Sequence, residues 1–337
     1  MPVNPTVTQG AHSALLKKSR TLTSLNLPLL GAVAALVALG LTVVHSAVEG
    51  SNEYTFNRQV AGVAMGVIAM LIIWRYDYRK LSGYIVPLLV AVCVLMLSPH
   101  LPVIGVTVSG ATSWVRIFGV QMQPGEPAKI VTIVLMAAVV ARYRGRLAST
   151  QEYLKMLGIC LIPFFCIMTQ PDLGTGLVIL VIGFTILFTG GVDRRMLLFT
   201  VAAAVLGIAC ILILDPIMDT WMGRDVFIKD YQMNRLLVFI DSEVDPTGVG
   251  YNLTQAKIAV GSGGLLGKGL GNGTQSTLGF LPEAPTDFIF CVLAEELGFL
   301  GCTLLLGLSA ALFAAAFRVM HHSSTLFGKL SYLREPR

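Results

Sequence analysis

Charged residues are scarce in this sequence: Asp, Glu, Lys and Arg make up 13% of its 337 residues. A soluble domain carries about 25%, so the chain has too little charge to cover the surface of a water-soluble protein. Hydrophobic residues make up 55%, and the mean hydropathy is +0.75. They form long unbroken runs instead of the short alternating segments of a β-barrel. The sequence therefore predicts an all-α polytopic membrane protein.

Signals for metal, disulfide and nucleotide sites are also missing. The six cysteines include no CxxC pair and no partner histidines, and their apolar surroundings are typical of small buried side chains. The glycine-rich stretch 261–273 does not match a Walker A loop, because Ser262 occupies the first glycine position and Gly269 the Ser/Thr position. The backbone amides near Lys268 remain the feature of this stretch that can hold a phosphate group.

Eight apolar runs approach the length of about 20 residues that a membrane-spanning helix needs. The first run follows Lys17, Lys18 and Arg20 and has no small-residue cleavage site, which predicts a signal anchor that is retained. The eight expected spans are 26–47, 59–74, 82–98, 127–141, 154–169, 174–190, 196–214 and 288–317.

Cationic residues collect before the first expected span and after the second, fourth, sixth and eighth, always on the same side of the membrane. Positive charge marks the cytoplasmic side, so both termini are expected to be cytoplasmic. One outer loop is then 99–126, and a much larger one is 215–287. The predicted organisation is a cytoplasmic segment 1–25, a transmembrane domain 26–317 and a cytoplasmic tail 318–337.

Two polar motifs interrupt the apolar chain at expected helix starts on the outer side. In "QPGEPAK", Glu126 lies near the positive end of a helix dipole, and Lys129 follows at a spacing that allows an ion pair. In "QPDLGTG", Asp172 and Thr175 can cap the returning helix. Capped helix starts account for both motifs. Substrate binding accounts for them as well, because an acid this close to the hydrocarbon is a functional suspect.

A third polar stretch runs from Tyr231 to Glu296. Near its end lies the third polar motif, "FLPEAPTDFIFCVL", which puts Asp287 directly before a long apolar run. Thr286 and Asp287 can cap the helix that follows, or Asp287 can act as a general base. The acids Glu283, Glu295 and Glu296 bracket the same helix start. Together with the cations Lys129, Arg235 and Lys268, they suit an anionic substrate that is attached to the membrane.

These polar blocks resemble the family of shape, elongation, division and sporulation (SEDS) proteins, and its elongation-type, rod-shape branch most of all. The division-type relatives usually have a different sequence in the glycine-rich block. The resemblance covers residues of about 25 to 317. It rests on "QPGEPAK", "QPDLGT", "YQMNR", "DPTGVGYNLTQAKIAVGSGGLLGKGLGNGTQS" and "FLPEAPTDFIFCVLAEELGFLG".

The resemblance implies a peptidoglycan glycosyltransferase that polymerises lipid II on the outer face of the bacterial cytoplasmic membrane, for cell elongation and shape. The alternatives are a lipid II flippase and a non-catalytic scaffold of the cell-wall machinery. The implied partners are a class B penicillin-binding protein, which is a transpeptidase, and other membrane proteins of the elongation complex. No nucleic acid is expected. The implied cofactor is at most a divalent cation, Mg²⁺ or Mn²⁺.

The resemblance also implies functional residues. Asp287 matches the family's essential aspartate, and its role as base or as metal ligand stays open. The other polar positions that match are expected to bind substrate: Glu126, Lys129, Gln170, Asp172, Thr175, Gln232, Arg235 and Lys268. Members of the family normally continue with two further helices after the eighth span, so the resemblance implies that this chain lacks them.

Overall fold

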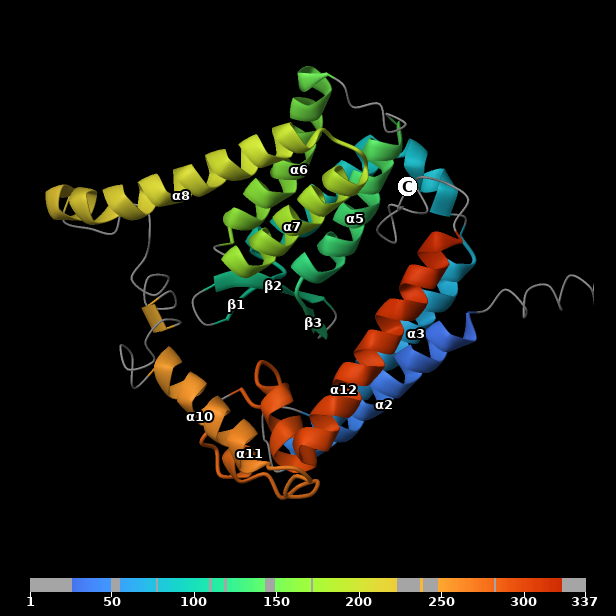
Figure 1. The fold of residues 1–337 in the computed structure, drawn as a ribbon, viewed down its shortest axis with the longest axis vertical. Helices are drawn as coiled ribbons and strands as arrows, with labels where there is room; N and C mark the ends of the chain where they lie inside the picture. The colour runs from blue at the N-terminus through green and yellow to red at the C-terminus, as the bar shows by residue number, and fades with distance from the viewer. Residues whose placement is uncertain are drawn as a thin grey trace, which may run out of the picture. The chain divides into compact units, whose positions relative to one another are not determined.

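The computed structural model describes residues 26–49, 55–76, 78–108, 111–117, 120–142, 149–170, 172–222, 237–238, 248–281 and 283–322. The chain folds as two compact units (Figure 1). Unit 1 consists of Met1–Val67 and Leu237–Val319, and unit 2 of Ile68–Leu236 and Met320–Arg337. Each unit has its own buried core, and the two are described separately below.

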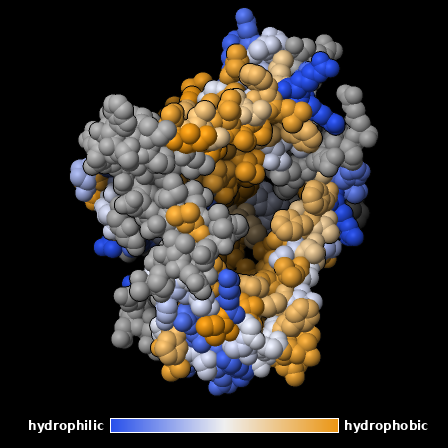
Figure 2. All heavy atoms as spheres, turned by 60° about the vertical axis from the view of Figure 1, so that its left-hand side comes forward, coloured by the Kyte–Doolittle hydropathy of each residue, from blue (hydrophilic) through white to orange (hydrophobic). Residues whose placement is uncertain are grey.

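The helical membrane fold is confirmed. Each of the eight expected spans coincides with a helix: α2 (Leu27–Val48), α3 (Phe56–Trp74), α4 (Ile85–Leu97), α5 (Gly125–Arg142), α6 (Thr150–Met168), α7 (Leu173–Thr189), α8 (Arg194–Met222) and α12 (Ile289–His321). In α2, α3, α6, α8 and α12 the helix is long and apolar enough to cross a membrane, while α7 is apolar but shorter. Large apolar side chains are exposed on these helices, as lipid-facing surfaces require (Figure 2).

Unit 2 contains a small antiparallel sheet that the sequence did not predict. The expected outer loop 99–126 forms β1 (Gly105–Val108), β2 (Ala111–Ile117) and β3 (Val120–Met122), in the order β1-β2-β3. Short 3-10 helices η1 (Tyr78–Gly83) and η2 (Ser98–His100) flank α4. The strands are rich in β-branched and aromatic residues, but they are too short to show a clear alternation. The domain is therefore mostly helical instead of purely helical.

The core of unit 2 lies around α5. This helix packs against α4, α6 and α7, and its segment Leu135–Val140 is completely buried. Small residues let the helices approach closely. A Cβ atom at Gly183 of α7 would overlap the Cys160 sulfur of α6, and one at Gly190 would overlap the Val140 side chain. These close contacts hold the middle of α7 against α6 and its end against the last turns of α5.

Unit 1 is built around the start of α12. The apolar side of α2 packs there with Leu281, Ala284 and α10 (Val249–Ser262). The helix α10 lies within the large outer loop that the sequence predicts over 215–287. The glycine-rich segment after α10 leads through the single turn α11 (Thr274–Thr277) to α12. This unit therefore brings the third polar motif against the first turns of α12.

Candidate active site

In unit 2, the first two polar motifs meet where α5 and α7 begin. Asp172 caps α7: its Oδ1 accepts a hydrogen bond from the Thr175 amide at 3.0 Å, and its Oδ2 one from the Thr175 hydroxyl at 2.7 Å. Oδ2 also accepts a hydrogen bond from Gln123 Nε2 at 3.1 Å, which links the two motifs. Gly125 lets the starts of α5 and α7 approach closely, because a Cβ atom at this position would lie only 3.2 Å from Thr175 Cγ2.

Glu126 and Lys129 form the ion pair that their spacing predicts. Lys129 Nζ lies 2.8 Å from Glu126 Oε1 in the first turn of α5, and the two side chains are 24% and 61% exposed. An exposed ion pair of this kind contributes at most about 1 kcal/mol to stability. Both groups are therefore accessible to a charged ligand at little cost to the fold.

Gln170 has a different environment. Its side chain is 1% exposed, and its Nε2 donates to the backbone carbonyl of Met96 at the end of α4. Its Oε1 has no hydrogen-bond partner among the described residues. Gln170 thus ties α4 to the α6–α7 connection, and contact with a substrate stays a prediction.

Asp172 has both a capping role and a charge, and two substitutions should separate them. Asp172→Ala removes the cap and the bond to Gln123, which should lower the free energy of unfolding by about 1–2 kcal/mol. Asp172→Asn keeps a good cap and should melt close to the unmodified protein in detergent. Equal melting temperatures for the alanine and asparagine variants would contradict the capping role.

In unit 1, the glycine-rich segment binds the backbone of α12 at a break in that helix. Gly298 has φ 65° and ψ −161°, outside the helical region. The carbonyls of Glu295 and Glu296 accept from the amides of Lys268 and Gly269, both at 2.9 Å. On the other side of the break, the Phe299 and Leu300 amides donate to the carbonyls of Gly264 and Leu265, at 2.9 and 3.2 Å. The broken helix and the segment therefore satisfy each other's backbone groups.

The buried carboxylate of Glu295 fixes the next part of this segment. Glu295 is 0% exposed, and its Oε1 lies 2.6 Å from Lys268 Nζ. The same oxygen accepts hydrogen bonds at 2.8 Å from both the amide and the hydroxyl of Thr274, and the Gln275 amide donates at 3.2 Å. The backbone amides of this stretch thus bind protein groups, although the sequence suggested a phosphate ligand for them.

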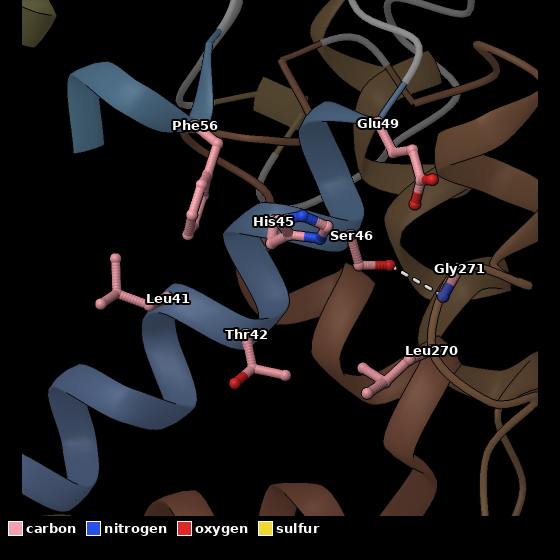
Figure 3. Close-up of a pocket in the computed structure, with 8 residues that line it drawn as sticks. All are labelled: Leu41, Thr42, His45, Ser46, Glu49, Phe56, Leu270 and Gly271. Atoms are coloured by element: carbon pink, nitrogen blue, oxygen red, sulfur yellow. Dashed lines mark hydrogen bonds between the residues drawn. The ribbon is translucent and has the colours of Figure 1, made fainter. Parts of the chain in front are cut away.

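Glu296 joins the same segment to α2 through Ser46. The Ser46 hydroxyl donates to Glu296 Oε1 at 2.7 Å and accepts from the Gly271 amide at 2.8 Å. Glu296 is 1% exposed, and its Oε2 has no partner among the described residues. In front of Ser46 lies a pocket of about 380 Å³, walled by the last turns of α2, Phe56 and Leu270 (Figure 3).

Asp287 lies exposed in the turn just before α12. Asp287 does not cap α12, although the sequence allowed that role, because its carboxylate accepts no hydrogen bond within the described part of the chain. The neighbouring Thr286 hydroxyl bonds to Glu283, whose carbonyl also accepts from the Phe288 amide at 3.3 Å. The turn is thus held by its backbone and leaves the Asp287 carboxylate accessible.

The predicted site residues therefore fall into two clusters, one in each unit. Gln232 and Arg235 lie outside the described residues. No three His, Cys, Asp or Glu side chains come together as a metal site in the described ranges. Substrate contact stays a prediction for every residue named, and so does a divalent cation.

Sequence reasoning missed several residues of these clusters, Gln123 and Ser46 among them. Gln123 was part of a quoted motif, and its position before α5 was a usable signal. Ser46 lies in an apolar helix whose sequence gives no sign of a partner more than 200 residues away.

A family model and curated relatives both match this chain over most of its length. The model of the FtsW, RodA and SpoVE family, described as "Cell cycle protein", matches residues 25–333. Peptidoglycan glycosyltransferase MrdB of Escherichia coli is 35% identical over 300 residues, which are 88% of this chain and 76% of that protein. The probable peptidoglycan glycosyltransferase FtsW of Trichlorobacter lovleyi is 31% identical over 323 residues, covering 94% and 81%.

Solved structures show the same fold. A structure described as structural coordination of polymerization and crosslinking by a peptidoglycan synthase complex matches with a TM-score of 0.69 and 27% identity, covering 90% of this chain and 81% of that one. The rod shape determining protein RodA of Thermus thermophilus matches in fold with a TM-score of 0.61 and 24% identity, covering 91% and 79%. The chain belongs to the FtsW/RodA/SpoVE family of cell cycle proteins, the family that its polar motifs resemble.

Proposed function

We propose that the protein is a peptidoglycan glycosyltransferase that polymerises lipid II on the outer face of the cytoplasmic membrane during cell elongation. One observation carries the proposal: a chain 35% identical to MrdB presents the accessible carboxylate of Asp287 at the start of a membrane-spanning helix. The match to a rod shape determining protein in fold agrees with the elongation role.

The reaction transfers a glycan from a lipid diphosphate to a sugar hydroxyl. The acceptor's 4-hydroxyl oxygen forms a bond to the donor's C1 as the bond from C1 to the undecaprenyl diphosphate oxygen breaks. Asp287 accepts the hydroxyl proton as general base, and its exposure lets an acceptor reach it. The diphosphate leaves with the bonding electron pair and needs nearby positive charge.

Two cations of unit 2 are proposed to bind the diphosphate: Lys129 and Arg235. Lys268 of unit 1, which is also expected to bind substrate, has its Nζ 2.6 Å from the Glu295 carboxylate. Lys129 is exposed enough to exchange Glu126 for a phosphate oxygen. Glu126 then keeps the lysine in place while the site is empty. Gln170, Asp172, Thr175 and Gln232 are proposed to complete substrate binding, and the first three do so by fixing the start of α7.

A divalent cation is the alternative use of Asp287. Mg²⁺ is typically held by one or two carboxylates together with substrate phosphates, so one exposed aspartate fits a metal that arrives with the diphosphate. Polymerisation that stops with a chelator and recovers with Mg²⁺ or Mn²⁺ would favour the metal ligand, and unchanged polymerisation would favour the base.

The proposed partner is a class B penicillin-binding protein, which would crosslink the strands. The related synthase complex couples polymerization and crosslinking, as its description states. The multi-pass chain would lie in the bacterial inner membrane with both termini in the cytoplasm.

The proposed orientation can be tested by cysteine labelling. Leu278 is 65% exposed before α12 and should lie outside, while Arg195 in the first turn of α8 should lie inside. In intact cells an impermeant maleimide should label Leu278→Cys and leave Arg195→Cys unlabelled until the membrane is opened. The reverse pattern would contradict the orientation.

Polymerisation and transbilayer movement should be measured on the same proteoliposomes, because a flippase is the main alternative. Labelled lipid II presented on the outer side should become glycan strands without prior movement across the bilayer. A protein that moves lipid II but makes no strands would be a flippase, and one that does neither would be a scaffold.

A further inference from the structure

The segment before Asp287 is hydrogen-bonded to Glu295, a residue of α12 that follows Asp287 in the sequence. Glu295 follows the start of α12 and binds the amides of Thr274 and Gln275 from inside the helix. The chain between Gln275 and Asp287 therefore forms a closed loop, with the same helix holding its beginning and its end. A shift of this attachment must move the segment that ends in Asp287.

The loop is held at a second point between its ends. The Leu281 amide donates to the Gln275 carbonyl at 3.1 Å, and the Leu281 and Ala284 side chains are 3% and 4% exposed in the core of unit 1. The Glu283 carbonyl then accepts from the Thr286 and Phe288 amides. Hydrogen bonds thus hold Leu281 to Gln275 and, separately, the turn from Glu283 to Phe288, and the chain joins these two parts.

The donors around Glu295 make a negative charge necessary at this place. Its Oε1 receives the Lys268 ammonium, the Thr274 amide and hydroxyl, and the Gln275 amide. Hydrogen bonds to a charged group are about twice as strong as those to a neutral one. A neutral amide of the same shape would keep the volume and lose much of the attraction.

We propose that Glu295 is a positioning residue for the transfer reaction: it fixes the segment 274–288 to α12 and so sets the place of Asp287. The inference rests on the proposed function, because it assumes that Asp287 acts in the reaction. Glu295 itself is buried and has no contact with a substrate to offer.

Glu295→Gln is the informative variant, and hydrogen exchange gives a readout independent of activity. Peptides covering 272–281 should exchange at least about fivefold faster in the variant, because the Thr274 and Gln275 amides lose their charged acceptor. Peptides from Leu135–Val140 in unit 2 should exchange as before.

Kinetics on lipid II test whether the attachment matters for the reaction. The kcat of Glu295→Gln should fall about 10–100-fold, the range expected when a reacting group moves by about 1 Å. The KM should change less than about threefold, since the cations proposed to bind the diphosphate, Lys129 and Arg235, are untouched. Glu49→Gln is the matched control: it makes the same charge change on an exposed carboxylate of unit 1, and it should leave both constants within about twofold.

The outcomes separate the inference from the proposed function. Faster exchange at 272–281 with a reduced kcat supports the positioning role. Unchanged exchange would overturn it, because Glu295 would not hold the segment, and so would faster exchange with an unchanged kcat. Absence of polymer from the unmodified chain would instead overturn the proposed function, and the positioning role would fall with it.

Discussion

Asp287→Asn should lower the rate of glycan polymerisation by about 10²–10⁴-fold, the usual contribution of a general base. Asparagine has the shape of aspartate but does not accept the proton from the acceptor hydroxyl. Because the Asp287 carboxylate is exposed and makes no hydrogen bond within the described part of the chain, the melting temperature in detergent should stay unchanged. The measurement is the initial rate of polymer formation from labelled lipid II at saturating substrate.

Glu283→Gln is the control for this prediction, because Glu283 is an exposed acid in the same turn. It should keep the polymerisation rate within about threefold. A rate for Asp287→Asn close to that of the unmodified protein would contradict the base. A large loss in the Glu283 variant as well would show that the turn as a whole, and not Asp287, carries the effect.

Gly298→Ala should destabilise unit 1 by more than about 3 kcal/mol. A residue other than glycine at φ 65° and ψ −161° costs about 1–3 kcal/mol from backbone strain alone. The added Cβ would also overlap the Gly267 amide nitrogen and lie 2.8 Å from the carbonyl carbon and oxygen of Leu265. These are backbone atoms that the hydrogen bonds across the break hold in place, so they have no room to move.

Gly307→Ala is the matched control for the break in α12. Gly307 lies in the same helix, and a Cβ atom there would meet nothing within 4 Å. Alanine in a regular helix is favoured over glycine by about 1 kcal/mol, so this variant should melt at or above the unmodified protein. Thermal unfolding in detergent compares the two variants. Equal melting temperatures would mean that the break at Gly298 is not required.

Hydrophobic run length was sufficient to predict the helices, because a bilayer sets the length of each span. The expected span 59–74 corresponds to Phe56–Trp74, and 174–190 to Leu173–Thr189. The ends were less predictable: α8 continues to Met222, beyond the expected end at 214. Hydropathy measures the apolar length of a helix, while the residue at which its last turn ends also depends on local packing.

The motifs predicted short-range contacts well and long-range ones poorly. The Glu126–Lys129 pair and the Asp172 cap follow from spacing along one helix, and both are formed. Glu295 was noted only as one acid among several, because its partners Lys268 and Thr274 come from a segment more than 20 residues away. A break in a long apolar helix likewise depends on what packs against it, so Gly298 gave no usable signal.

The central claim is tested most directly by the glycan that the purified protein makes alone from labelled lipid II in proteoliposomes. Separation of the products by length should show strands of many disaccharides from the unmodified chain and from Glu49→Gln, and none from Asp287→Asn. Strands of equal length and amount from Asp287→Asn, or no strands from the unmodified chain, would contradict the account.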